Sequence, residues 1–133
     1  MSVCVDTSAI VAVLDASDKR HSRAAVAWTD LVIGKREMVI TSYAVVETAA
    51  VLQARYEPPA VRAFLEDLLP LMRVQWIDAA LHEAAASMFL ACVSRGAPSL
   101  VDCATFESIR RYGIQEVFAY DKHFTDRGFN LIG

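Results

Sequence analysis

The chain is short of cysteine, glycine and basic residues, and each shortage excludes a class of protein. Its three cysteines, Cys4, Cys92 and Cys103, are odd in number and show no C-x-x-C spacing, which argues against a disulfide framework and a zinc site. Its five glycines form neither G-x-G-x-x-G nor a P-loop, so a glycine loop for nucleotides is not indicated. A net charge of −3 argues against broad, nonspecific binding to nucleic acid.

The chain also lacks long apolar runs and closely spaced histidines. Its most apolar stretch, residues 84–93, is far shorter than the ~20 residues that cross a bilayer. No basic region precedes the first apolar run, so we expect no secretory signal, no membrane association and a cytoplasmic location. His21, His82 and His123 lie far apart, which favours surface or packing roles over ligation of a transition metal.

What the chain does have is a repeating alternation of short apolar runs and helical patterns. With 133 residues, 55% of them hydrophobic, residues 1–133 are expected to form a single domain with a packed core. Strands are expected at 3–5, 38–40, 74–77, 116–120 and 131–132, and helices at 8–14, 21–33, 42–56, 59–69, 79–95 and 100–112. This order predicts an α/β fold of three layers, with a short, mostly parallel central sheet flanked by helices.

Four carboxylates stand in apolar surroundings in distant segments of the chain. Asp6 follows the first expected strand, and Asp121 follows the strand that ends at Tyr120. Glu47 lies in the helix after the second strand, and Asp102 lies in the first turn of the helix over 100–112. Because the ends of parallel strands meet at one edge of a sheet, this placement predicts a single acidic pocket.

Each of these acids also has a purely structural interpretation. Asp6 can cap the helix that follows it, Asp102 completes a Ser99-x-x-Asp102 capping box, and Asp121 can form a turn. Glu47 can reach solvent or meet an arginine from elsewhere. The sequence alone leaves both interpretations open for every one of the four.

A shared divalent ion is the physical solution if the acids do cluster. Neighbouring carboxylates raise one another's pKa unless a cation neutralises them. Oxygen-only ligation suits Mg²⁺ or Mn²⁺, and such ions meet substrate phosphates in proteins. Metal-assisted hydrolysis of a phosphodiester is therefore the implied reaction.

Local basic clusters could form a rim around such a pocket in spite of the negative net charge. The alternative is that each is a solvated helix end or turn. The candidates are Lys19-Arg20-His21 with Arg23, Lys35-Arg36, Arg110-Arg111, and Lys122-His123 with Arg127.

The acidic motifs, in this order, resemble those of the PIN-domain nucleases, and the size of the chain is similar to that of the VapC-like ribonuclease toxins of type II toxin-antitoxin modules. The resemblance covers essentially the whole chain. It rests on Val5-Asp6-Thr7-Ser8, Val46-Glu47, Leu100-Val101-Asp102 and Tyr120-Asp121-Lys122-His123-Phe124.

The resemblance implies a divalent-metal-dependent endoribonuclease that hydrolyses RNA phosphodiester bonds with Mg²⁺ or Mn²⁺. It implies Asp6 and Asp102 as principal metal ligands, and Glu47 and Asp121 as acids that complete the pocket and position metal or water. Thr7 or Ser8 would assist through hydroxyl contacts. A cognate antitoxin whose tail fills the acidic groove, and a homodimer, are implied partners.

Alternatives stay open at this stage. The chain could be a noncatalytic PIN-fold module that binds protein or RNA, and the apolar helices over 43–56 and 59–69 could serve partners or simply pack in the core. Asp126 competes with Asp121 as the fourth acid, although family position favours Asp121. Glu107 lies about 140° around the helix from Asp102 and is left outside the site. The RNA target is not indicated.

Overall fold

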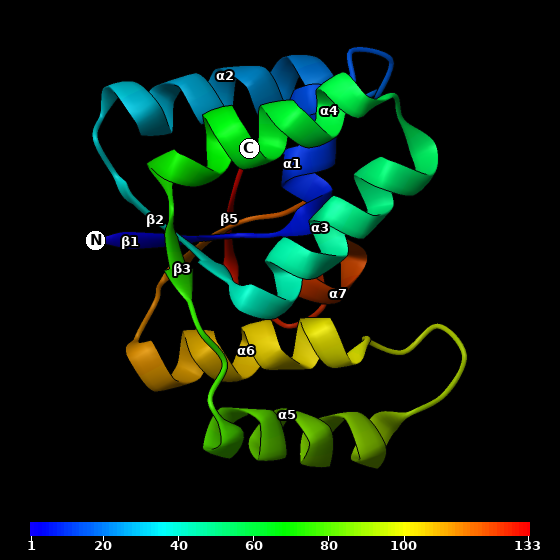
Figure 1. Ribbon diagram of the computed structural model, residues 1–133. Coiled ribbons are helices and arrows are strands. Elements are labelled where there is room, and N and C mark those ends of the chain that lie inside the picture. The colour runs from blue at the N-terminus through cyan, green and yellow to red at the C-terminus, as the bar shows by residue number, and fades with distance from the viewer.

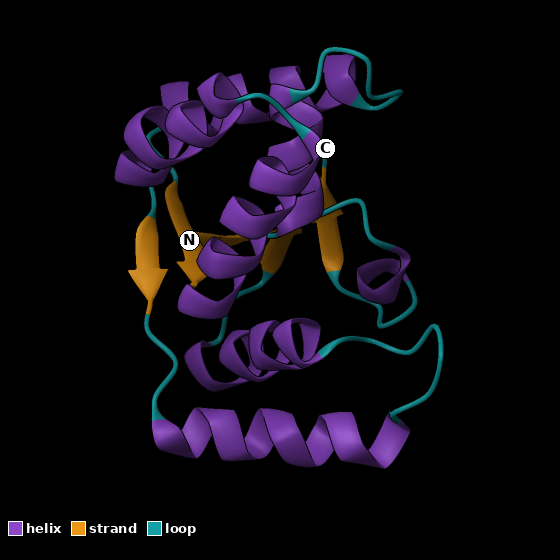
Figure 2. Cartoon of the chain, turned by 45° about the vertical axis from the view of Figure 1, so that its right-hand side comes forward, coloured by secondary structure: helices purple, strands orange, loops and turns teal.

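All 133 residues are described by a computed structural model, in which a parallel sheet lies between helical layers (Figures 1 and 2). The elements are β1 (Ser2–Val5), α1 (Thr7–Leu14), α2 (His21–Ile33), β2 (Glu37–Thr41), α3 (Ser42–Arg55), α4 (Pro58–Arg62), a π-helical segment (Ala63–Leu68), a 3-10 turn (Leu69–Leu71), β3 (Arg73–Gln75), α5 (Ala79–Cys92), α6 (Leu100–Tyr112), β4 (Glu116–Phe118), α7 (Lys122–Thr125) and β5 (Asn130–Ile132).

The five strands have the order β3-β2-β1-β4-β5, and every neighbouring pair is parallel. Cys4 in the central strand pairs with Val39 on one side and with Val117 on the other. The predicted α/β fold with a parallel sheet is confirmed. All strands therefore end at one edge, and α1 and α3 begin directly at that edge.

Alternation along the strands divides the core between the two faces of the sheet. Val3, Val5 and Phe118 lie in the larger apolar cluster, which packs against α1, α2, α3 and the segment after α4. Cys4 and Val117 lie in a second cluster, built against α6. Helix α5 packs on α6 as an outer element, beyond the sheet (Figure 1).

Helices α2 and α6 have the expected bounds, and other elements differ from the prediction. The single helix expected at 59–69 was wrong, because that segment consists of α4, the π-helical segment and the 3-10 turn. Helix α5 stops at Cys92 instead of Arg95, because the backbone of Val93 is already extended (φ −61°, ψ 119°). Strand β3 ends at Gln75, since the chain turns to donate a hydrogen bond from the Ile77 N–H to Ser42 Oγ (3.0 Å). Strand β4 ends at Phe118, because the Tyr120 N–H bonds to Ser8.

The apolar side chains of α3 and of the segment after α4 divide between core and surface. Leu52 and Phe64 are fully buried and Leu68 is nearly so, which favours core packing over a partner surface for these side chains. Leu65 and Val46 are exposed instead, at 42% and 69%. No helix in the structure combines the length and the apolar character that a membrane span requires.

Candidate active site

The four acids from distant segments converge on one pocket of about 590 Å³ at the carboxyl-terminal edge of the sheet. Asp6 follows β1 and Asp121 follows β4, whereas Glu47 and Asp102 project from α3 and α6. The pocket is further lined by Thr7, Ser8, Val11, Asp15, Asp18, Arg20, Val51, Arg55, Tyr56, Ala97, Ser99 and His123. The predicted clustering therefore occurs.

Asp6 is the most buried of the four, at 4% exposed, and it caps α1. Its Oδ2 accepts hydrogen bonds from the Ser8 N–H (3.0 Å) and the Ser8 hydroxyl (2.5 Å). The N–H of Asp6 donates to the carbonyl of Phe118 (3.0 Å), which ties the residue to β4. Its Oδ1 has no hydrogen bond within the chain, so one carboxylate oxygen stays available to the pocket.

Asp102 and Asp121 have the same arrangement at two other helices. Asp102 Oδ2 accepts from the Ser99 N–H (3.0 Å), and Ser99 Oγ accepts from the Asp102 N–H (3.1 Å), which completes the capping box. Asp121 Oδ1 accepts from the His123 N–H (2.8 Å) and caps α7. The second oxygen of each carboxylate has no partner within the chain.

Glu47 is held by the hydroxyl groups beside it and forms no ion pair with Lys or Arg. Thr7 Oγ1 donates to Glu47 Oε2 (3.2 Å) and lies 2.8 Å from the hydroxyl oxygen of Thr48. Thr48 in turn donates to the carbonyl of Ala44 one turn earlier (2.6 Å). Glu47 Oε1 is left free. The arginine partner that the sequence allowed is absent from the structure.

Ser8 links two of the segments that carry acids. Its hydroxyl donates to Asp6 and accepts a hydrogen bond from the Tyr120 N–H (2.9 Å), one residue before Asp121. The exit of β4 is thereby fixed against the start of α1. Thr7 thus contacts Glu47 and Ser8 contacts Asp6, and the assisting role that the resemblance implies for them stays a prediction.

Burial and mutual repulsion make the ionised acids unfavourable in the free pocket. Burial raises the pKa of Asp6 to about 6, the Ser8 hydrogen bonds oppose this, and the charges of Asp102 and Asp121 add to it. Burial also raises the pKa of Glu47, with the charge of Asp102 next. Burial likewise raises the pKa of Asp102. A bound cation would relieve all three, because it favours the ionised forms.

The donor atoms of the pocket fit a divalent ion. One ligand atom each from Asp102, Asp121 and His123 lies within 4.8 Å of the others, close enough to share an ion. Asp6, which was predicted as a principal ligand with Asp102, is not part of this group, and its role as a ligand stays a prediction. Asp6 lines the same pocket. A donor set dominated by carboxylate oxygens suits hard ions.

His123 was expected in a basic rim or in a surface or packing role, and not as a metal ligand, yet it lies in the group that could share an ion. Its side chain is 17% exposed, and Nε2 lies 4.0 Å from Asp121 Oδ1. The available signal was its position two residues after Asp121, but the short helix α7 that turns it toward the pocket was not expected. Asp126 is exposed and does not line the pocket, and Glu107 is buried and paired with Arg110 elsewhere.

Of the basic clusters that the sequence offered as a rim, only Arg20 and His123 contribute to the pocket wall. Arg55, at the end of α3, also lines the pocket and was not among those clusters. Arg36 pairs with Glu116 at 2.5 Å, and Arg111 lies 3.5 Å from Asp78. The latter two arginines therefore have structural partners away from the acids.

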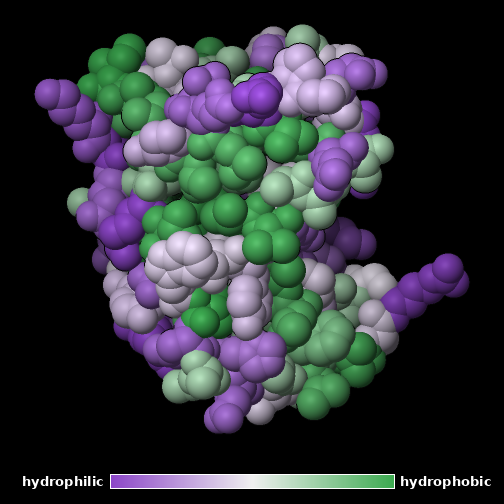
Figure 3. Space-filling model, viewed as in Figure 1, coloured by the Kyte–Doolittle hydropathy of each residue, from purple (hydrophilic) through white to green (hydrophobic).

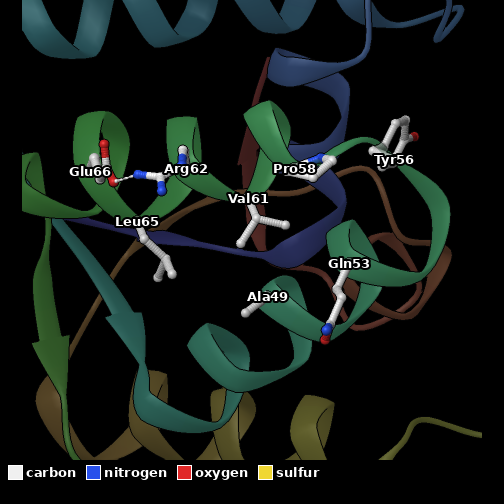
Figure 4. A pocket seen from close by; sticks show the side chains of 8 residues that line it. All are labelled: Ala49, Gln53, Tyr56, Pro58, Val61, Arg62, Leu65 and Glu66. Atoms are coloured by element: carbon white, nitrogen blue, oxygen red, sulfur yellow. Dashed lines mark hydrogen bonds and ion pairs between the residues drawn. The ribbon is translucent and has the colours of Figure 1, made fainter.

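A second, mainly apolar pocket of about 590 Å³ lies between α3 and the segment that begins at Pro58. Val61 and Leu65 point from that segment toward Ala49 and Gln53 of α3 (Figure 4). Hydrophobic residues also gather over α3 and α4 on this face of the molecule (Figure 3). Tyr56 lines both this pocket and the acidic one.

Comparisons with known proteins agree with this geometry. The PIN domain family matches residues 3–130. The 23S rRNA-specific endonuclease VapC20 of Mycobacterium tuberculosis is 34% identical over 129 residues, which cover 96% of this chain and 95% of that protein.

Solved structures give the same result. The crystal structure of M. tuberculosis VapC20, described as a Sarcin-Ricin loop cleaving toxin, matches with a TM-score of 0.79 and 29% identity over 96% of this chain and 95% of that one. FitAcB from Neisseria gonorrhoeae matches with a TM-score of 0.68 and 18% identity over 100% and 97%, which shows the fold alone. Since these matches span nearly its full length, the chain belongs to the PIN-domain family, and the expected relationship to the VapC-like ribonuclease toxins is confirmed.

Proposed function

We propose that the chain cleaves 23S ribosomal RNA at the acidic pocket, with Mg²⁺ or Mn²⁺ as cofactor. The observation that carries the proposal is that four carboxylates, each with one oxygen free of hydrogen bonds, line the same pocket. Support for the substrate comes from the relative that is named as a 23S rRNA-specific endonuclease. The sarcin-ricin loop is the first RNA element to test, because the solved relative is described as cleaving it.

The acids divide into ion-holding and water-facing groups in this proposal. Asp102, Asp121 and His123 would hold the ion together, with Asp6 as a further oxygen ligand. When bound, the ion would activate a water molecule and stabilise negative charge on the phosphate. These acids would be catalytic, because they would contact the ion or the reacting atoms.

Glu47 is placed to handle the proton of the attacking water. Thr7 donates a hydrogen bond to Glu47 Oε2, and Oε1 of this pocket residue has no hydrogen bond within the chain. Burial raises the pKa of Glu47, which makes its carboxylate a better proton acceptor. Thr7 and Ser8 would act as positioning residues, through Glu47 and Asp6 respectively.

We also infer that the chain binds a cognate antitoxin, forms a homodimer and works in the cytoplasm, where it would reach ribosomal RNA. The apolar pocket of Figure 4 supports a protein partner, since Leu65 is 42% exposed there beside Val61. Residues 1–133 would work as one domain, because β1 near one end of the chain and β5 near the other belong to the same sheet.

The test is cleavage of purified 23S rRNA and of a hairpin with the sarcin-ricin loop sequence, with 16S rRNA as the control RNA. We expect one cut in 23S rRNA, mapped by primer extension, that requires Mg²⁺ or Mn²⁺ and disappears in EDTA and in Asp102→Asn. A cut that survives in Asp102→Asn would refute the acidic pocket as the active site. Metal binding without cleavage of any RNA would favour the noncatalytic PIN-fold module.

A further inference from the structure

The acidic pocket has too much negative charge to receive RNA with a metal ion alone. Six carboxylates line it, from Asp6, Asp15, Asp18, Glu47, Asp102 and Asp121, against two guanidinium groups, from Arg20 and Arg55. A single divalent ion offsets only two of those charges. A polyanion that enters the pocket therefore needs fixed positive charge beside the ion, and the pocket wall supplies it at few positions.

Arg20 is held in place from three sides. Asp18 Oδ1 accepts hydrogen bonds from both the backbone N–H (2.8 Å) and Nε (3.4 Å) of Arg20. Its Nη1 donates to the carbonyl of Tyr120 (3.3 Å), and its guanidinium carbon lies 5.2 Å from the centre of the Tyr120 ring. Tyr120 directly precedes Asp121, so the guanidinium is anchored to the same strand exit that positions an acid of the site.

One edge of the Arg20 guanidinium is left without a partner. Nη2 makes no hydrogen bond within the chain, and the side chain is 33% exposed. A guanidinium that is already oriented loses little conformational freedom when it binds a phosphate, and its planar fork matches phosphate oxygens. Arg55 lines the same pocket but is exposed and makes no hydrogen bond, so it has no comparable orientation.

We propose that Arg20 is a substrate-positioning residue that binds a phosphate of the RNA backbone next to the scissile bond. The inference rests on the proposed function, because it assigns a role toward the RNA that the acidic pocket would cleave. By holding this flanking phosphate, Arg20 would determine which phosphodiester of the RNA lies at the acids. The acids would then act on the phosphate next to the one that Arg20 binds.

Arg23, in the first turn of the helix α2 that follows Arg20, provides a matched control. Its guanidinium carbon lies 5.4 Å from the centre of the same Tyr120 ring, and Nη2 donates to the carbonyl of Gly133 (2.9 Å). Arg23 lines a different hollow with Val26 and Asp30, outside the acidic pocket. Arg23→Gln therefore removes the same charge and a similar ring contact without touching the proposed phosphate site.

The experiment measures RNA binding in a Glu47→Gln background, which suppresses cleavage and keeps the ion-holding acids. A fluorescein-labelled sarcin-ricin hairpin is titrated with Mn²⁺ present, at several salt concentrations, and followed by fluorescence anisotropy. We expect Arg20→Gln to weaken binding about tenfold and to reduce the slope of log affinity against log salt by about 0.7 to 0.9, the loss of one phosphate contact. Arg23→Gln should change neither quantity.

Two further measurements separate positioning from folding. In the otherwise wild-type chain, Arg20→Gln should raise KM about tenfold and leave kcat within about a factor of three. Manganese calorimetry should give the same affinity for Arg20→Gln as for the wild type. Arg20→Lys keeps the positive charge but lacks the planar guanidinium. It should therefore show the wild-type slope of log affinity against log salt, and it provides the test if Arg20→Gln is unstable.

The outcomes distinguish this inference from the proposed function. Equal salt slopes for Arg20→Gln, Arg20→Lys and Arg23→Gln would overturn the role of Arg20 and leave the proposed function standing. No hairpin binding in the Glu47→Gln background would overturn both. A slope that depends on Arg20, in a chain that binds the hairpin without cutting it, would support the phosphate site and refute cleavage at the sarcin-ricin loop.

Discussion

Replacing Asp6 with Asn should stabilise the metal-free protein at neutral pH, although Asp6 is a helix cap and a site acid. The residue is 4% exposed, and burial is the main reason that its pKa rises to about 6. At pH 7.5 the folded chain must therefore keep an unfavourable buried charge. Asn retains an oxygen that accepts the Ser8 hydrogen bonds and removes that charge.

The magnitude follows from the difference between the folded and unfolded pKa of Asp6. A rise from 3.8 to about 6 corresponds to about 3 kcal/mol, at about 1.4 kcal/mol per unit. Because the folded state binds this proton more tightly, stability is greatest below the unfolded value. It falls as pH rises from about 4 to about 6 and is level above that range. Asn cannot ionise at this position, so the stability of Asp6→Asn does not have this dependence on pH.

The assay is urea unfolding followed by circular dichroism, in EDTA, between pH 4.5 and pH 8. At pH 7.5 we expect Asp6→Asn to exceed the wild type by about 3 kcal/mol, with an unchanged dependence on urea concentration. The difference should shrink toward pH 4.5. Asp126→Asn removes an exposed acid outside the pocket and should follow the wild type throughout.

Stability in saturating Mn²⁺ tests the same reasoning in the opposite direction, because the ion favours the ionised form of Asp6. At a concentration of about 100 Kd it should add about 2.7 kcal/mol to the stability of the wild type, and less to Asp6→Asn, which offers the ion one charge fewer. The reasoning would be refuted if Asp6→Asn were less stable than the wild type at pH 7.5 in EDTA. It would also fail if the variant lost stability between pH 4.5 and pH 6.5 as steeply as the wild type does.

Three further predictions follow from the site and the core. Asp102→Asn should abolish the heat of manganese binding in calorimetry, while Asp126→Asn keeps it; retained binding in Asp102→Asn would place the ion elsewhere. Glu47→Gln should lower kcat by about 10²- to 10⁴-fold with little change in manganese affinity, and an unchanged kcat would exclude a proton-handling role. Phe64→Ala should cost about 3 to 5 kcal/mol in urea unfolding because Phe64 is fully buried, whereas Leu65→Ala should cost far less.

The sequence predicted α2 and α6, whose ends depend on neighbouring residues. Helix α2 ends before Gly34, and α6 runs from the Ser99 capping box to Gly113, which adopts the left-handed conformation with φ +66°. The end of β4 was not predictable in this way, because it depends on Ser8, more than a hundred residues earlier in the chain. The apolar pattern of the sequence continues to Tyr120 and does not indicate that contact.

The same distinction applies to the site. The acids could be found because charged residues in apolar segments are unusual, and parallel strands end at one edge. Arg20 and His123 could not be selected with the same certainty, because basic residues are common at helix ends. Their place in the pocket depends on how the chain turns after Asp18 and Asp121, where a side-chain oxygen accepts from the N–H two residues on.

Capping and site chemistry were weighed as competing explanations for the aspartates, but the structure combines them. A carboxylate has two oxygens, and in Asp6, Asp102 and Asp121 one accepts backbone N–H groups at a helix start while the other is free. The cap thus fixes the direction of the free oxygen, and the helix amino terminus favours the ionised form. An isolated acidic cluster would have to order its side chains on binding an ion, whereas these are ordered by folding. Asn substitutions keep the cap and remove the charge, so they measure the second role separately from the first.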